Sequence, residues 1–279
     1  MAQEQWTCGG LTFDVQVDGP AQGDPVLLLH GFPQNSTEWR AVAARLQAAG
    51  YQTIAPDQRG YSPGARPEDV REYRMDRLVS DAVALLEHRG LASAHVVGHD
   101  WGAAVAWSLT AAHPERVRTL TAISVPHPAA FAAALRSERD QRRKSAYMLF
   151  LRRPKTPERV LLAFDARAMR RLLRRSGMSK AEIQGYVEPL QQPGALTAAL
   201  NWYRASSGRV AAATPPVTRP TTFLWSDRDP AIGRGSAEAC GQYVESNYRF
   251  VELNGLNHWL PDQAPDRVAE AILARMRAC

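Results

Sequence analysis

The chain has 279 residues, of which 45% are hydrophobic and 22% charged, and its formal net charge is +6. This composition provides the material for a folded core and excludes disordered, collagen-like and low-complexity classes. No apolar run approaches the roughly 20 residues that a membrane helix needs, and the first six residues lack the layout of a signal peptide, so we expect a cytoplasmic protein with no membrane partner.

Short apolar runs alternate with segments of helical periodicity along most of the chain. Strands are predicted at 25–30, 51–57, 94–97, 118–125, 221–225 and 248–253, and helices at 75–89, 103–112 and 264–277. The first run is apolar throughout, which is typical of a strand buried on both faces of a parallel sheet. The alternation predicts an α/β fold with a mostly parallel central sheet flanked by helices.

The stretch from 128 to 219 departs from this alternation. It has a helical period, almost no strand pattern and many arginines, and prolines mark both of its ends. We predict a helical cap inserted into an α/β body that consists of residues 1–127 and 220–279. Insertions near the carboxyl ends of sheet strands commonly cover the functional site.

Positive charge is concentrated in this insertion. Residues 136–175 carry 14 Lys or Arg and 4 Asp or Glu, a balance of +10 against +6 for the whole chain. One explanation is a surface for an anionic partner. The explanation that we favour is solvated helix surface, because no aromatic interleaving or known motif indicates a nucleic-acid partner.

The three cysteines, Cys8, Cys240 and Cys279, lie far apart in the sequence. Their odd number and wide spacing match neither a disulfide framework nor a zinc-binding motif. We therefore expect ordinary reduced thiols.

A glycine-rich turn at Gly98–Gly102 follows a predicted strand and opens a helix. This context is typical of the nucleophile elbow, G-x-S-x-G, whose glycines permit a tight turn that leaves the central side chain exposed. The central residue here is Asp100, and the amide of Trp101 at the helix N-terminus is placed to donate to an oxyanion. The alternative is a turn in which Asp100 only caps the helix.

A carboxylate at the elbow changes the reaction. A serine that attacked a saturated carbon would form an ether, which water does not readily cleave, whereas Asp100 would form an ester that activated water hydrolyses. The elbow therefore suits the opening of an epoxide or the displacement of a halide through a covalent alkyl-enzyme ester. This scheme needs no metal and no organic cofactor.

The base and the acid are expected after the last strands, in the chain order of this fold. His258 follows the last predicted strand and is our choice for the base, with His127 as its only serious rival. Asp227 and Asp229 both follow the preceding strand. We choose Asp229, because a strand, a three-residue turn and then Asp is the usual placement of the acid; the alternative for either is a turn or capping residue.

The second oxyanion donor is expected in the loop after an early strand. His30–Pro33 occupies that place, and the amide of Phe32 is the predicted donor. We expect His30 to orient the loop rather than to act as the base.

Together these motifs resemble the epoxide hydrolases of the α/β-hydrolase fold. The matching segments are His30–Pro33, Asp57–Tyr61, Gly98–Gly102 and Asn257–Trp259. The resemblance covers nearly the whole chain, and the insertion corresponds to that family's helical cap. It implies hydrolysis of a small-molecule epoxide by water to a vicinal diol. We expect a monomer or a homodimer.

The family also implies two cap tyrosines that hydrogen-bond the epoxide oxygen. Tyr203 lies at the family's position, Tyr147 is the second candidate, and Tyr186 is then structural. A phenol, with a reference pKa of about 10, donates to a developing alkoxide without being ionised at neutral pH. With Phe32 and Trp101, these tyrosines form the expected substrate-binding set; the alternative is that both only pack the cap.

Two other functions compete with this one. Haloalkane and haloacid dehalogenases share the Asp elbow, but they typically carry Asn directly after His-Gly or Arg after the nucleophile, where this chain has Phe32 and Trp101. A catalytically silent ligand-binding member of the fold would typically have lost one catalytic residue, and here all are present. Fold alone does not give function.

Overall fold

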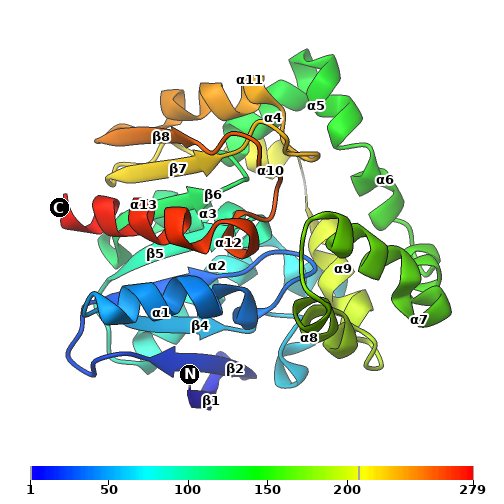
Figure 1. Cartoon of the computed structure of the whole chain (residues 1–279), viewed down its shortest axis with the longest axis horizontal. Coiled ribbons are helices and arrows are strands. Elements are labelled where there is room, and N and C mark those ends of the chain that lie inside the picture. The colour runs from blue at the N-terminus through cyan, green and yellow to red at the C-terminus, as the bar shows by residue number, and fades with distance from the viewer. Residues whose placement is uncertain (1, 207, 279) are drawn as a thin grey trace.

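The computed structural model describes residues 2–206 and 208–278 and contains one central sheet with helices on both faces (Figure 1). Its strands are β1 (Ala2–Cys8), β2 (Leu11–Asp18), β3 (Pro25–Leu29), β4 (Gln52–Pro56), β5 (Ala94–His99), β6 (Val117–Ile123), β7 (Thr221–Trp225) and β8 (Tyr248–Glu252). Across the sheet they follow the order β1-β2-β4-β3-β5-β6-β7-β8. The pairs β1–β2 and β2–β4 are antiparallel, and the other neighbours are parallel. The predicted α/β fold is confirmed.

The helices outside the insertion fall between or after these strands. They are α1 (Arg40–Ala48), α2 (Met75–His88), α3 (Trp101–Ala112), α11 (Arg234–Glu238), α12 (Leu260–Gln263) and α13 (Pro265–Arg277). Short 3-10 helices add η1 (Ser36–Trp39), η2 (Pro63–Ala65), η3 (Val70–Tyr73), η4 (Pro114–Arg116) and η5 (Ala239–Tyr243).

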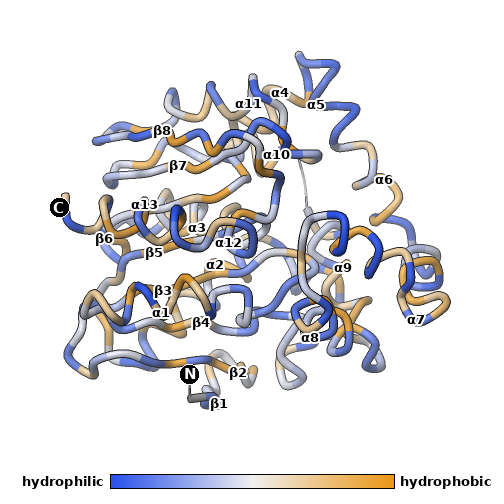
Figure 2. Tube along the Cα trace, viewed as in Figure 1, coloured by the Kyte–Doolittle hydropathy of each residue, from blue (hydrophilic) through white to orange (hydrophobic). Residues whose placement is uncertain are grey.

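Alternating side chains of β3 enter two different cores. Val26 and Leu28 pack in a cluster with residues of α1 and α13, whereas Leu27 and Leu29 belong to a cluster that includes α2 and α3. Successive residues of a strand point to opposite faces, so a strand that is apolar throughout needs helices on both sides. Figure 1 shows α1 and α13 on the face toward the viewer, and Figure 2 marks the strand as hydrophobic.

The described residues between β6 and β7 form helices and turns, apart from one isolated bridge at Val217. The helices are α4 (Pro128–Ser137), α5 (Arg139–Lys144), α6 (Tyr147–Leu151), α7 (Thr156–Arg175), α8 (Lys180–Leu190), α9 (Ala195–Ala205) and α10 (Gly208–Ala212). We call residues 128–219 the insertion. Its helices α6 to α9 lie beside the sheet, on the right in Figure 1, while α4 packs on α11 and η5 of the body.

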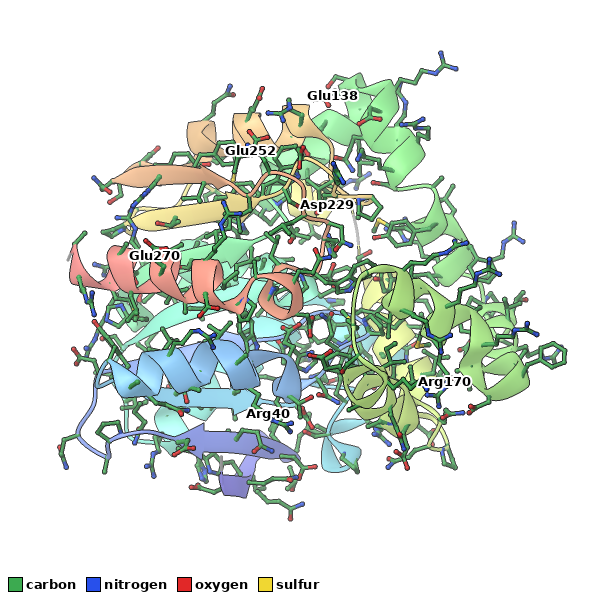
Figure 3. All side chains as sticks on the ribbon, viewed as in Figure 1. Arg40, Glu138, Arg170, Asp229, Glu252 and Glu270 are labelled. Carbon is green, nitrogen blue, oxygen red and sulfur yellow. The ribbon has the colours of Figure 1, made fainter. Side chains whose placement is uncertain are left out.

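The parallel strands all end at the edge of the sheet that faces the insertion. The loop with Phe32 follows β3, Asp100 follows β5, Asp229 follows β7 and His258 follows β8. Because the carboxyl ends of parallel strands meet at one edge, residues from distant parts of the chain come together there. Figure 3 labels Asp229 at the place where the strands meet the insertion.

Two of the three cysteines lie in the part of the chain that the structure describes. Cys8 and Cys240 are buried free thiols, as predicted, and Cys279 lies outside the described residues. Burial raises the pKa of the Cys240 thiol to about 12. A thiol in that state is a poor nucleophile, because the thiolate is the reactive form.

Candidate active site

Asp100 occupies the bend between β5 and α3 in a backbone conformation that side chains rarely adopt, with φ 52° and ψ −118°. The flanking glycines make this bend possible. A Cβ on Gly98 would lie 2.2 Å from the carbonyl oxygen of Gly102, and one on Gly102 would lie 2.0 Å from the carbonyl oxygen of Leu29. The strained conformation holds the Asp100 carboxylate at the edge of the sheet, as in a nucleophile elbow.

His258 stands between two carboxylates. Its Nδ1 donates to Oδ2 of Asp229 at 2.8 Å, and its Nε2 lies 3.2 Å from Oδ2 of Asp100. All three side chains are buried, and Asp229 has no exposed surface. The arrangement joins a carboxylate, an imidazole and a second carboxylate in one hydrogen-bonded line, which is the geometry of a nucleophile, a base and an orienting acid.

The charges in this line shift one another's pKa values. Burial by itself would lower the pKa of His258, but the Asp229 charge, together with hydrogen bonds to both carboxylates, raises it to about 10. Burial opposes ionisation of Asp100, but the hydrogen bond and charge of His258 outweigh it and lower the pKa of that carboxyl. Near neutral pH the resting site therefore holds an ionised Asp100 beside a protonated His258.

Two backbone amides lie beside Asp100 in space or in the chain. The Phe32 amide donates to Oδ1 of Asp100 at 2.8 Å. The Trp101 amide is the first of α3, and helix geometry gives such an amide no acceptor within its own helix. These two amides are the predicted oxyanion donors, and one of them already touches the carboxylate that would carry the oxyanion.

The loop that carries Phe32 is held by His30, as predicted. Nδ1 of His30 lies 3.0 Å from the Gly31 carbonyl oxygen, and its Nε2 accepts from the Gln58 amide at 3.1 Å. The Gln58 side chain in turn donates to the His30 carbonyl oxygen at 2.6 Å. With both ring nitrogens in use, His30 positions the loop and has no free nitrogen to act as a base.

The two rival residues lie in other surroundings. Nδ1 of His127 accepts from the Ala129 amide at 3.2 Å, and its Nε2 lies 3.1 Å from the Pro215 carbonyl oxygen, so the ring caps α4. Asp227 is exposed and accepts from the Gly255 amide at 2.6 Å. Neither contact joins the line through His258.

Tyr203 of α9 packs against two aromatic residues that neighbour Asp100. Its ring lies edge-on to Trp101 and Phe32, at centroid distances of 5.0 and 5.6 Å. The side chain is 3% exposed. Burial, followed by the charges of neighbouring groups that include Asp100, raises its pKa well above the usual value. The phenol is therefore a neutral donor near neutral pH.

Tyr147, at the start of α6, lies next to Tyr203 with ring centroids 6.4 Å apart. Although 43% of the residue is exposed, desolvation of its hydroxyl raises its pKa, and the charges of Asp100 and Asp229 act in the same direction. The structure thus brings both predicted tyrosines to the side of the site that faces the insertion. Tyr186 lies elsewhere: its hydroxyl donates to Oδ1 of Asp262 at 2.6 Å.

Residues 24–265 match the model of a protein family described as the alpha/beta hydrolase fold. The chain belongs to that family. It is 33% identical to the "AB hydrolase superfamily protein YfhM" of Bacillus subtilis, over 96% of this chain and 95% of that protein. It is also 31% identical to "Epoxide hydrolase A" of Mycobacterium tuberculosis, over 92% of each chain.

Solved structures agree with these sequence relatives. The crystal structure of Epoxide Hydrolase A from Mycobacterium thermoresistibile superimposes with a TM-score of 0.86 at 27% identity, and the match covers 99% of this chain and 98% of that one. The resemblance to epoxide hydrolases predicted from the motifs of this α/β-hydrolase chain is confirmed.

Sequence reasoning missed the support behind His258 in this hydrolase. The carbonyl oxygen of His258 accepts from Oγ of Ser124 at 2.6 Å and from Nε2 of His99 at 3.0 Å. Nδ1 of His99 lies 3.1 Å from Oε2 of Glu38. Burial lowers the pKa of His99 to about 4, so its imidazole is neutral near neutral pH, and burial raises the pKa of the Glu38 carboxyl. These partners come from distant segments of the chain, and no local sequence motif predicts their contacts.

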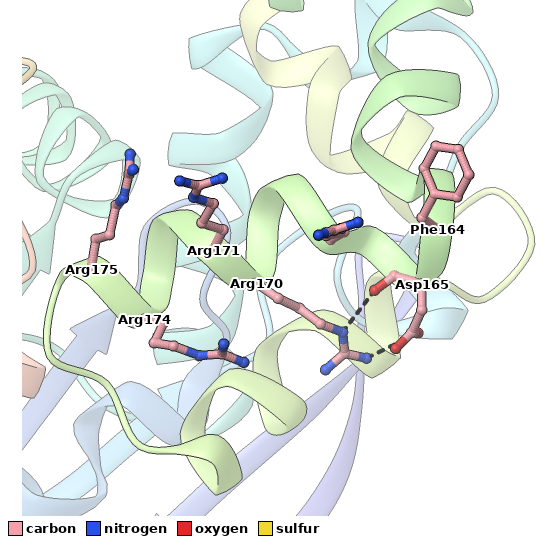
Figure 4. Close-up of a pocket in the computed structure, with 7 residues that line it drawn as sticks. Phe164, Asp165, Arg170, Arg171, Arg174 and Arg175 are labelled. Atoms are coloured by element: carbon pink, nitrogen blue, oxygen red, sulfur yellow. Dashed lines mark hydrogen bonds and ion pairs between the residues drawn. The ribbon is translucent and has the colours of Figure 1, made fainter.

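The basic surface predicted for the insertion forms a groove of about 510 Å³ along α7 (Figure 4). Its lining consists of Phe164, Asp165, Arg167, Arg170, Arg171, Arg174 and Arg175. Arg170 pairs with Asp165 at 3.2 Å. None of the predicted site residues lines this groove. Within residues 2–206 and 208–278, no helix combines the length and the apolar character that crossing a membrane requires.

Proposed function

We propose that this α/β hydrolase opens epoxides to vicinal diols through an ester on Asp100. The observation that carries the proposal is a carboxylate, not a hydroxyl, at the elbow, in contact with both His258 and the Phe32 amide. The names of its relatives support the choice of substrate class, because Epoxide hydrolase A of Mycobacterium tuberculosis is among them.

In the first step an oxygen of Asp100 attacks one epoxide carbon, and the bond from that carbon to the epoxide oxygen breaks. The oxygen leaves as an alkoxide, to which Tyr147 and Tyr203 donate. Their raised pKa values keep the phenols protonated and able to donate. The product of this step is an alkyl ester of Asp100 that bears the new hydroxyl.

Ester formation also prepares the base. The Asp100 charge helps to keep His258 protonated, and that charge disappears when the ester forms. The pKa of His258 then falls, and the proton it releases balances the proton that the alkoxide takes up. The neutral imidazole that results is the form that can accept a proton from water.

In the second step His258, held by Asp229, takes a proton from a water molecule that attacks the ester carbonyl. The amides of Phe32 and Trp101 stabilise the oxyanion of the tetrahedral intermediate. The intermediate collapses by breaking the bond between the carbonyl carbon and the substrate oxygen, and that oxygen takes the proton of the hydroxyl that water added. The diol leaves, and the ionised Asp100 and protonated His258 are restored.

The test combines a substrate panel with one variant. Purified protein is incubated with styrene oxide, a haloalkane and a simple ester, and the diol, halide and acid products are measured. Diol from styrene oxide supports the proposal. Halide release without diol would identify a dehalogenase, and no product at all would favour a silent binding protein.

His258→Gln separates the two steps. The variant retains the nucleophile but lacks the base, so intact-mass spectrometry should show protein heavier by the mass of one styrene oxide. If His258→Gln turns over normally, the assignment of the base is wrong.

A further inference from the structure

The loop after β7 is built around the carboxylate of Asp229. Oδ1 accepts from the amides of Ala231 and Ile232 at 2.7 and 2.9 Å, while Oδ2 faces His258. The position of the acid is therefore tied to the backbone of residues 229–233. Whatever holds this backbone also sets the direction from which the acid meets the imidazole.

One side chain of the insertion holds that backbone at two points. Gln141 of α5 has no exposed surface, and its Nε2 donates to the Ala231 carbonyl oxygen at 2.8 Å. Its Oε1 accepts from the Gly233 amide at 2.8 Å and from Oγ of Ser236 at 2.9 Å. A carboxamide is suited to this place, because it presents a donor and an acceptor side by side.

The same side chain also contacts the segment that leads to Tyr147. Nε2 of Gln141 donates to Oγ of Ser145 at 2.9 Å, and Tyr147 follows two residues later at the start of α6. Lys144, on the same helix, donates to the carbonyl oxygen of Asp229. Helix α5 thus contacts both the loop after β7 (residues 229–233), called the acid loop below, and the segment that leads to Tyr147.

We propose that Gln141 is a positioning residue for both steps of the reaction, through the Asp229 loop for ester hydrolysis and through Ser145 for the placement of Tyr147. This inference rests on the proposed function. Reaction rates respond strongly to such placement, since a misplacement of about 1 Å can lower a rate by about a hundredfold. Lys144 contacts the Asp229 carbonyl oxygen of the acid loop and supports only the hydrolysis step.

The main test compares Gln141→Met with Arg143→Gln. Methionine has a similar length and no hydrogen-bonding amide, while Arg143 is exposed on the same helix and its side chain pairs with Asp140 at 3.0 Å. Single-turnover experiments with styrene oxide measure ester formation and ester hydrolysis separately. In folded Gln141→Met we expect both rates to fall at least tenfold, and in Arg143→Gln both to stay within twofold of the parent.

Lys144→Met is a second variant with a smaller expected effect on the rates. It tests the role of the acid loop if Gln141→Met does not fold. It should slow ester hydrolysis by severalfold and leave ester formation within twofold. Rates within twofold of the parent in a folded Gln141→Met protein would overturn the proposal, even if its melting temperature fell. Equal slowing of both steps in Lys144→Met would overturn the assignment of different roles to Gln141 and Lys144.

A readout without substrate distinguishes this inference from the proposed function. If Gln141 positions the acid, the loss of its contacts weakens the bond from His258 to Asp229, and the imidazole pKa measured by NMR titration should fall in Gln141→Met. An unchanged pKa would overturn the positioning of the acid, whatever the substrate. If the parent protein forms no ester or diol while this pKa shifts, the reaction assignment fails and the contact to the acid loop stands.

Discussion

The body and the insertion hold their parts of the site by different forces. Asp100, His258 and Asp229 of the body are joined by hydrogen bonds of 2.8 and 3.2 Å. The rings of Tyr203 and Tyr147 in the insertion pack edge-on against neighbouring aromatic rings, with centroids 5.0 to 6.4 Å apart. Hydrogen bonds constrain distance and angle closely, whereas aromatic pairs tolerate a wider range of geometry.

This difference in contacts corresponds to different roles of the body and the insertion in the proposed reaction. In the proposed reaction the body holds the groups that make and break bonds, which need one geometry for any substrate. The insertion places the groups that meet the epoxide oxygen, whose position depends on the shape of the substrate. We therefore infer that substitutions in the body alter the rate for all epoxides alike, and that substitutions in the insertion alter the choice among them.

The largest expected effect is the loss of the nucleophile. Asp100→Asn removes the charge that attacks the epoxide and leaves the size of the side chain almost unchanged. Steady-state turnover of styrene oxide should fall by about a thousandfold or more, because the loss of one member of a catalytic unit removes most of the activity of the whole unit. Turnover within tenfold of the parent would show that the body does not supply the nucleophile proposed here.

The next effect tests the insertion. Replacing both Tyr147 and Tyr203 by Phe removes the donors to the alkoxide, so single-turnover ester formation should slow by about 10² to 10⁴-fold, the range typical of general acid catalysis. Of the single variants, Tyr203→Phe should be the more damaging, because its ring is buried against Phe32 and Trp101.

Tyr186→Phe is the matched control for that pair. Its hydroxyl bonds to Asp262 of the body, so the variant should lower the free energy of unfolding by about 1 to 3 kcal/mol. Ester formation should stay within severalfold of the parent rate. If Tyr186→Phe slowed that step as strongly as the double variant does, the assignment of donors in the insertion would be wrong.

A pH titration tests the electrostatics of the body. The pKa of His258 is raised to about 10, whereas the pKa of a histidine in the unfolded chain is about 6.5. Protonation therefore stabilises the fold fully below about pH 6.5, and that contribution is lost as pH rises through 10. Thermal unfolding between pH 6 and 10 should show this decline, and NMR should show a lower His258 pKa in Asp100→Asn. A His258 pKa near 6.5 in the parent would contradict the resting ion pair.

The smallest effect is expected at the acid that we did not choose. Asp227→Asn alters an exposed side chain that accepts from the Gly255 amide, so kcat for styrene oxide should stay within about twofold, as is usual for surface substitutions. Asp229→Asn, the matched variant two residues later, should slow ester hydrolysis strongly. The reverse ranking would transfer the role of the acid to Asp227.

The sequence predicted those parts of the molecule that depend on short motifs and local periodicity. The apolar run at β3, the glycines of the elbow and the chain order of Asp100, Asp229 and His258 are readable in this way, since the fold sets where each must stand. Strands β1 and β2 are absent from the prediction, although the alternation of Phe13, Val15 and Val17 indicates a strand with one buried face.

Other features could not be predicted, because they arise from pairs of residues that meet only in the folded chain. The contact between Glu38 and His99 joins positions 61 residues apart, and Gln141 reaches Gly233 across 92 residues. Neither pair has a spacing or a neighbouring motif that would reveal it. Buried polar side chains must find partners, but the sequence alone does not say which ones.

The central claim is that the carboxylate of Asp100 is alkylated and then freed by water. It is tested most directly by one turnover of styrene oxide with excess protein in ¹⁸O-labelled water, followed by mass spectrometry of the diol and of the peptide that contains Asp100. We expect the label to enter the Asp100 peptide, while the first diol released carries an unlabelled oxygen from that carboxylate. Label in the diol with none in the peptide would show that water attacks the epoxide directly and that no ester forms on Asp100.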